Sequence, residues 1–123
     1  MKTVIVVFSD PKSGSDEALG RLFNALFLTL ELKEKKQDVT LIFQGAGTRW
    51  IAEASKSDHP THAIYATVKD KVLVCGGCAD VFGATVQAES AGARLVRDKQ
   101  IPGTPGVLDL SRYLDENARL ITF

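Results

Sequence analysis

The chain has 123 residues, an ordinary size for one domain, and its 45% hydrophobic and 24% charged residues are typical of a globular protein. Fifteen basic and fifteen acidic residues cancel, so no net field would draw the chain onto nucleic acid or an anionic membrane. The apolar run near the N-terminus, Val4–Phe8, is too short for a secretion signal or a membrane span. These features predict a single cytoplasmic domain covering residues 1–123.

The chain opens with a predicted buried strand and a long helix. Val4–Phe8 is a continuous apolar run, as expected for a strand covered on both faces. Ser13 or Ser15 can cap the helix that follows, which carries apolar residues at helical spacing and ends near the basic run KEKK. Phe27 and Leu28 lie off the apolar stripe. They indicate either a broad buried helix or a contact with another subunit.

The middle of the chain repeats the pattern. Val39–Phe43 predicts a second strand, and the turn QGAGT follows, with Thr48 as the cap of a short helix from about Arg49 to Ser55. Another helix is expected to begin at Pro60, capped by Ser57 or Asp58. Three residues of that helix are predicted to face inward: Ala63, Ile64 and Val68.

The last third completes the alternation of strands and helices. Val72–Val74 predicts a third strand. A helix over Ala79–Ala91 is expected to carry the apolar residues Val81, Phe82, Val86 and Ala88 and to have Gly92 as its C-cap. The remaining elements are a strand at Arg94–Val96, an irregular loop DKQIPGTPG, a helix over Leu108–Asn117 and a strand at Ala118–Phe123. This order predicts an α/β protein, a flavodoxin-like three-layer α/β/α sandwich around a mostly parallel five-stranded sheet.

The motif CGGC, residues 75–78, contains both cysteines of the chain at the end of the third predicted strand. Reactive groups of parallel sheets gather at the carboxyl ends of the strands. Gly76 and Gly77 allow a sharp turn and the close approach of a partner. A helix starting near Cys78 would place both sulfurs by its N-terminus, where a thiolate is favoured. Cys75 and Cys78 are therefore the candidate catalytic residues.

Other interpretations of the cysteines remain open at this point. Free cysteines are often small buried hydrophobes without chemistry. Asp80 is close enough to raise a thiol pKa, although an ordinary first-turn carboxylate explains it too. A thioredoxin-like protein would use similar local chemistry, but the motif here follows the third strand instead of an early one.

The sequence resembles the DsrE/DsrF-like family of small flavodoxin-like proteins associated with sulfur relay. The resemblance runs over nearly the whole chain and is carried by VIVVFSDPKSGSDEA, FQGAGTRWI, DHPTHAIYATVKDK, VCGGCADVFG and YLDENARLITF. It implies that Cys75 carries a persulfide passed between proteins, and that a sulfur donor or acceptor protein docks here. It also implies a homo-oligomer, a dimer or trimer, in keeping with the apolar surface at Phe27 and Leu28.

Cys78 departs from the pattern of the relay members, which do not need a second thiol three residues on. It leaves open a dithiol/disulfide redox protein, and a non-catalytic oligomeric binding module of the same fold remains a further alternative. Whether the chain is an enzyme, for example a sulfurtransferase, is therefore undecided by the sequence.

Two further motifs are candidate ligand sites. His59 and His62 precede the cysteines and could complete a zinc set, but a parallel-wound unit is expected to place the two pairs at opposite edges of the sheet. The loop QGAGTRW could cradle an anion, but it lacks a Walker lysine and a full dinucleotide motif. We therefore expect no metal and no cofactor, and we assign five residues to shaping the pocket: Gly45, Gly47, Thr48, Gly76 and Gly77.

Overall fold

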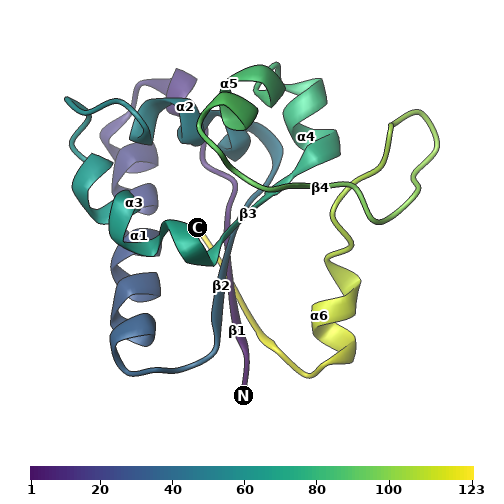
Figure 1. Ribbon diagram of the computed structural model, residues 1–123, viewed down its shortest axis with the longest axis horizontal. Coiled ribbons are helices and arrows are strands. Elements are labelled where there is room, and N and C mark those ends of the chain that lie inside the picture. The colour runs from purple at the N-terminus through teal and green to yellow at the C-terminus, as the bar shows by residue number, and fades with distance from the viewer.

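A computed structural model describes residues 1–123, and its centre is one entirely parallel sheet (Figure 1). The strand order is β4-β3-β2-β1-β5. The strands are β1 (Thr3–Val7), β2 (Val39–Phe43), β3 (Val72–Cys75), β4 (Leu95–Val96) and β5 (Arg119–Thr122). The prediction of a five-stranded parallel α/β sandwich is confirmed.

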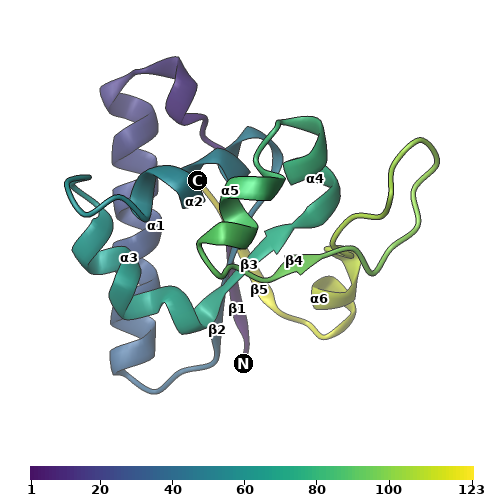
Figure 2. The same cartoon turned by 45° about the horizontal axis from the view of Figure 1, so that its top comes forward.

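The strand order explains how the helices are divided between the two faces. The chain steps in one direction from β1 to β4, and right-handed crossovers then put the intervening helices on one face. These are α1 (Asp16–Glu34), α2 (Trp50–Ala54), α3 (His62–Val68) and α5 (Thr85–Ser90). The return from β4 to β5 places α6 (Ser111–Asp115) on the opposite face, across the sheet from α1 and α3 (Figures 1 and 2).

Successive side chains of a strand point to opposite faces of the sheet, so the strands contribute to two hydrophobic cores of unequal size. In β1, Ile5 and Val7 join a cluster of 19 buried residues beneath the larger helical layer. Val4 and Val6 face the other way, into a cluster of only six buried residues that also contains Cys75. Because both faces are covered at this strand, its residues are apolar without a break, as the sequence indicated.

The predicted helix over Ala79–Ala91 is wrong in its continuity. The chain forms α4 (Gly76–Val81) and then α5, with Gly83 between them at φ 69°, a left-handed conformation that a helix cannot pass through. With this interruption, two of the four apolar residues point outward, since Val81 and Val86 are 70% and 72% exposed, while Phe82 is partly buried and Ala88 is buried. Gly92 does end α5, at φ 78°.

The start of α3 is also later than predicted. His59 accepts the backbone N–H of Thr61 at 3.2 Å through Nδ1, and this contact holds a turn where the sequence indicated a helix beginning at Pro60. Neither Ser57 nor Asp58 acts as the cap, because Thr61 precedes the first helical residue. Of the residues expected to face inward, Val68 is buried, Ile64 is partly buried and Ala63 is exposed; Tyr65 fills the core instead.

Other boundaries differ less. Of the two candidate caps for α1, Ser15 accepts the N–H of Ala18 at 3.1 Å. Thr48 does not cap a helix: it lies inside the 3-10 turn η2 (Gly45–Arg49), and its hydroxyl donates to the Gly45 carbonyl. The predicted helix over residues 108–117 shortens to α6, because Leu108 lies in an extended segment that crosses the end of β3. No helix of the chain combines the length and apolarity needed to cross a bilayer.

Candidate functional site

The CGGC motif joins the end of β3 to the start of α4. Cys75 is the last residue of β3 and the N-cap of α4, so its sulfur lies at the positive end of the helix. The side chain is fully buried, and the backbone N–H of Leu108 points at the Sγ atom from 3.4 Å away. Cys75 is at the strand end, as predicted, but it does not face an open crevice because the segment around Leu108 covers it.

Polar contacts favour the thiolate of Cys75 in spite of this burial. The Cys78 thiol donates to the Cys75 sulfur, and this contact is the largest of the effects that lower the pKa of Cys75 to about 6. Backbone N–H groups of Leu108, Cys78 and Gly77 lower the pKa further, while burial opposes them. The fold therefore keeps a negative sulfur in a closed, N–H-lined position.

Cys78 has the opposite character. Its pKa is raised, first because its thiol proton is held by the Cys75 sulfur and then because the side chain is partly buried. The backbone N–H of Gly45 partly offsets both effects. Both cysteines are free, and Cys78 is the only one of the two with exposed surface. The contacts around the buried Cys75 thus favour its thiolate, whereas those around Cys78, which lies nearer to solvent, favour its protonated thiol.

The two glycines of the motif are required by a neighbouring segment, residues 97–107. A Cβ atom on Gly77 would lie 2.6 Å from the Gly106 carbonyl oxygen, and one on Gly76 would lie 2.3 Å from Cγ of Arg97. Gly106 itself adopts φ 115° and presses against the Arg97 backbone. The segment therefore covers the cysteine turn closely, while its tip projects from the body of the protein (Figure 2).

An ion pair between Arg97 and Asp80 holds the segment 97–107 against the cysteine turn. Arg97 donates to both carboxylate oxygens of Asp80, at 2.9 and 3.1 Å, and Thr85 donates to the same carboxylate. These hydrogen bonds, with that of Arg97 first, lower the pKa of Asp80. Asp80 is consequently a paired structural carboxylate, as the simpler interpretation of the sequence held.

The glycine-rich turn after β2 contacts the cysteine pair through Gly45. Gly45, at φ 57°, brings its N–H to the Cys78 sulfur. Gly47 serves packing, because a Cβ there would lie 2.3 Å from the Val7 carbonyl oxygen. Thr48 is fully buried and bonded to Gly45, so it shapes the turn and does not reach the cysteines.

The histidines are placed differently from the prediction. His59 stacks edge-on against Trp50 with ring centres 6.2 Å apart, and the Trp50 indole donates to the Ser9 carbonyl just beyond β1. His59 therefore lies at the carboxyl edge of the sheet, the edge that also holds Cys75, and the expected separation across the sheet was wrong. His62 Nδ1 lies 2.9 Å from the Ala54 carbonyl. No group of three or more His, Cys, Asp or Glu side chains is arranged to hold a metal ion.

Sequence reasoning missed the residues that cover Cys75. Gly106 comes from the stretch that the sequence presented only as an irregular loop, Arg97 directly precedes that stretch, and Leu108 was expected to begin the last helix. One signal was available: Gly103 and Gly106, separated by Thr-Pro, both adopt positive φ and let the loop return to the cysteine turn. The antiparallel bridge between Lys99 and Val107 closes the same loop.

The structure therefore defines a small parallel α/β protein with two free cysteines where an inner strand of the sheet, β3, is followed by a helix. The chain belongs to the DsrE/DsrF-like family, whose sequence profile matches residues 1–123. Family membership indicates, at the level of the family, a function related to sulfur relay.

Comparison with individual proteins found one similar sequence and one similar structure. An uncharacterized protein of Methanocaldococcus jannaschii is 29% identical over 121 residues, which cover 98% of this chain and 94% of that protein. A solved structure of a conserved protein of unknown function from Bacteroides thetaiotaomicron superposes with a TM-score of 0.66 at 17% identity, over 99% of this chain and 94% of that one. The structural likeness concerns the fold alone.

Proposed function

We propose that this protein is a sulfur carrier that holds a persulfide on Cys75. The thiolate of Cys75 attacks the outer sulfur of a donor persulfide, R–S–SH; a new S–S bond forms on Cys75, and the donor leaves as the thiolate R–S⁻. No net oxidation occurs. Transfer to an acceptor thiolate is the same exchange with Cys75 as the leaving group, and it requires direct contact with a donor or acceptor protein in the reducing cytoplasm.

The observation that carries this proposal is the lowered pKa of Cys75. A pKa of about 6 makes the thiolate the main form at neutral pH, and the thiolate is the species that attacks a sulfane sulfur. The N–H groups that stabilise this thiolate would also stabilise the anionic outer sulfur of a persulfide. Burial shields such a persulfide from stray thiols, so the segment around Leu108 has to move aside during transfer.

A second candidate, dithiol/disulfide exchange, is favoured by the contact between the two thiols. Oxidation would form one S–S bond between Cys75 and Cys78; the proton of the Cys78 thiol is released, and two electrons pass to a disulfide or another two-electron oxidant. Intact-protein mass spectrometry separates the two. A persulfide donor should add one sulfur to the wild type and to Cys78→Ser but not to Cys75→Ser. Mild oxidant should remove two hydrogens only if the redox alternative holds.

Two outcomes would reject the sulfur carrier. One is loss of two hydrogens without any gain of sulfur. The other is no change of mass under either treatment together with slow alkylation of both thiols, which would leave a non-catalytic binding module. The double variant Cys75→Ser/Cys78→Ser is the control for sulfur retained non-specifically.

We also propose that the chain acts as a homo-oligomer, a dimer or trimer. The support is Phe27 on α1, which is 44% exposed and stacks on Phe23 with ring centres 5.6 Å apart. Leu28 contributes less surface, because it is partly buried against the main core. A second subunit covering Phe27 would remove this aromatic surface from water.

A further inference from the structure

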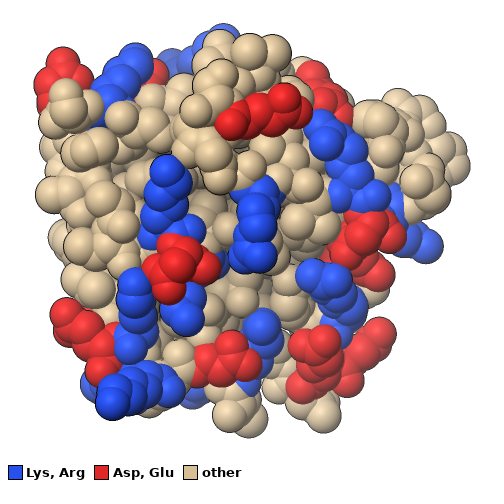
Figure 3. Space-filling model, in the orientation of Figure 1, with Lys and Arg blue, Asp and Glu red and all other residues tan.

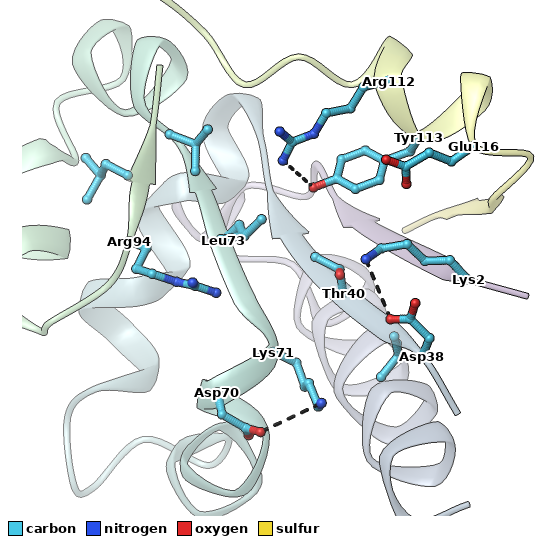
Figure 4. Close-up of a pocket in the computed structure, with 13 residues that line it drawn as sticks. Lys2, Asp38, Thr40, Asp70, Lys71, Leu73, Arg94, Arg112, Tyr113 and Glu116 are labelled. Atoms are coloured by element: carbon cyan, nitrogen blue, oxygen red, sulfur yellow. Dashed lines mark hydrogen bonds and ion pairs between the residues drawn. The ribbon is translucent and has the colours of Figure 1, made fainter. Parts of the chain in front are cut away.

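A groove of about 800 Å³ lies on the thinly covered face of the sheet, between α6 and β4. Its floor includes Thr40 of β2 and Leu73 of β3, and one wall is formed by Arg112 and Tyr113 of α6 with Glu116 directly after that helix (Figure 4). The groove exists because α6 has only five residues and leaves part of this face open. It is set toward the amino ends of the strands, whereas the cysteines follow a carboxyl end.

The strand register brings three cations to this groove. Lys2, Lys71 and Arg94 each stand two residues before a position that faces the α6 side, namely Val4, Leu73 and Val96. Because side chains alternate along a strand, the three cations share that face. Pairing of the strands places Arg94 beside Leu73 and Lys71 beside Thr40. Figure 4 shows Arg94 and Lys2 extending into the groove from opposite sides, with Lys71 directed toward Asp70 at its lower end.

These three cations have few or only distant carboxylate partners within the protein. Arg94 makes no salt bridge and no side-chain hydrogen bond, although Arg97 and Arg112 both have carboxylate partners. The Lys71 ammonium reaches Asp70 only at 4.0 Å, and Lys2 reaches Asp38 only at 3.6 Å.

The acidic residues at the rim point more toward water than the lysines do. The side chains of Asp38 and Asp70 are 64% and 57% exposed, against 26% for Lys2 and 33% for Lys71. Asp70 is in any case bonded to Lys33 at 2.7 Å, outside the groove. Figure 3 shows blue and red side chains interspersed over the face that contains the groove. Within the groove, Arg94 therefore has no carboxylate partner, and Lys2 and Lys71 are less exposed than the carboxylates they approach; Glu116 is the remaining carboxylate of the lining.

From this arrangement we infer that the groove binds a small organic phosphate. The phosphate group lies among Lys2, Lys71 and Arg94, accepts hydrogen bonds from their charged donors and takes another from the Thr40 hydroxyl. The organic part lies against Leu73 and the Tyr113 side of the groove. A tetrahedral dianion suits cations arriving from three strands better than a planar carboxylate, which is fully engaged by one guanidinium.

Phenyl phosphate is a suitable probe because it joins a phosphate to a flat apolar ring, and phenol is its uncharged counterpart. Titration of the full chain, followed by backbone NMR shifts and calorimetry, should show binding of phenyl phosphate that weakens with added salt. Shifts should concentrate at Thr40, Leu73 and Arg94. Arg94→Gln and Lys71→Gln should each weaken binding about ten-fold, the loss expected for one charge-assisted hydrogen bond.

Lys56→Gln is the matched control, because Lys56 is an exposed lysine on another part of the surface that lines no part of the groove. It should bind phenyl phosphate as the wild type does. The inference is overturned if the wild type does not bind phenyl phosphate, if phenol binds equally well, or if Arg94→Gln and Lys71→Gln match Lys56→Gln. None of these results concerns persulfide formation, which Cys75 alkylation in the same variants reports separately.

Discussion

Replacing Cys78 by alanine should raise the pKa of Cys75, because the Cys78 thiol supplies the largest of the effects that lower it. With a pKa of about 6, Cys75 is about nine-tenths thiolate at neutral pH. At the ordinary cysteine pKa of about 8.5, the thiolate would be only about 3%. The N–H groups of Leu108 and Gly77 remain in the variant, so its pKa should fall between these limits, and each unit corresponds to about 1.4 kcal/mol.

The assay is a pH titration of thiolate ultraviolet absorbance, combined with the rate of iodoacetamide alkylation at each pH. Cys78→Ser is the matched variant, because a hydroxyl still donates a hydrogen bond to the Cys75 sulfur. We expect the midpoint to stay low in Cys78→Ser and to rise by at least one unit in Cys78→Ala. Identical midpoints in the wild type and Cys78→Ala would refute the assignment of the low pKa to the Cys78 thiol.

Three further predictions concern stability and assembly. Gly77→Ala should lower the free energy of unfolding by about 1–3 kcal/mol in urea, since its Cβ would meet the Gly106 carbonyl. Gly20→Ala is the control, because Gly20 has open space around it within α1, and it should raise the free energy of unfolding by about 0.5–1 kcal/mol. Equal effects of the two substitutions would contradict the packing argument. The lowered pKa of Cys75 stabilises the fold above the unfolded pKa of about 8.5 and is lost as the pH falls through about 6. Urea unfolding should therefore show the wild type losing stability relative to Cys75→Ser over that window, and a constant difference would disprove the coupling. Phe27→Asp should shift sedimentation from an oligomer to the 13.3-kDa monomer, and a monomeric wild type would rule out the proposed assembly.

The strands were the most predictable part of the fold. Val39–Phe43 has the bounds that its apolar run indicated, and Val4 to Val7 lie in β1 as expected. A strand buried on both faces must be apolar throughout, so it can be recognised from its own residues as a continuous apolar run. Helix α1 was also predictable, because its apolar spacing and its two candidate serine caps lie close together in the sequence.

The shorter helices were less predictable for a physical reason. Elements of five to seven residues gain little from helix propensity, and contacts with the rest of the fold decide where they begin. Gly83 divided one predicted helix, and the contact of His59 with Thr61 delayed another. In both cases a single turn changed which apolar residues, such as Val81, reach solvent.

The sequence by itself determined the class of fold and the position of the two thiols, because strand periodicity and the CGGC turn are local features. It also assigned Gly45 to shaping the pocket, since consecutive parallel strands end at one edge, and the structure brings the Gly45 N–H to Cys78. Only the tertiary structure decided that Cys75 is fully buried whereas Cys78 is only partly buried. That outcome depends on Leu108, which is 33 residues away along the chain and approaches Cys75 because the return from β4 to β5 crosses the end of β3. Contacts made by such a crossover depend on strand order, and no local pattern of residues encodes strand order.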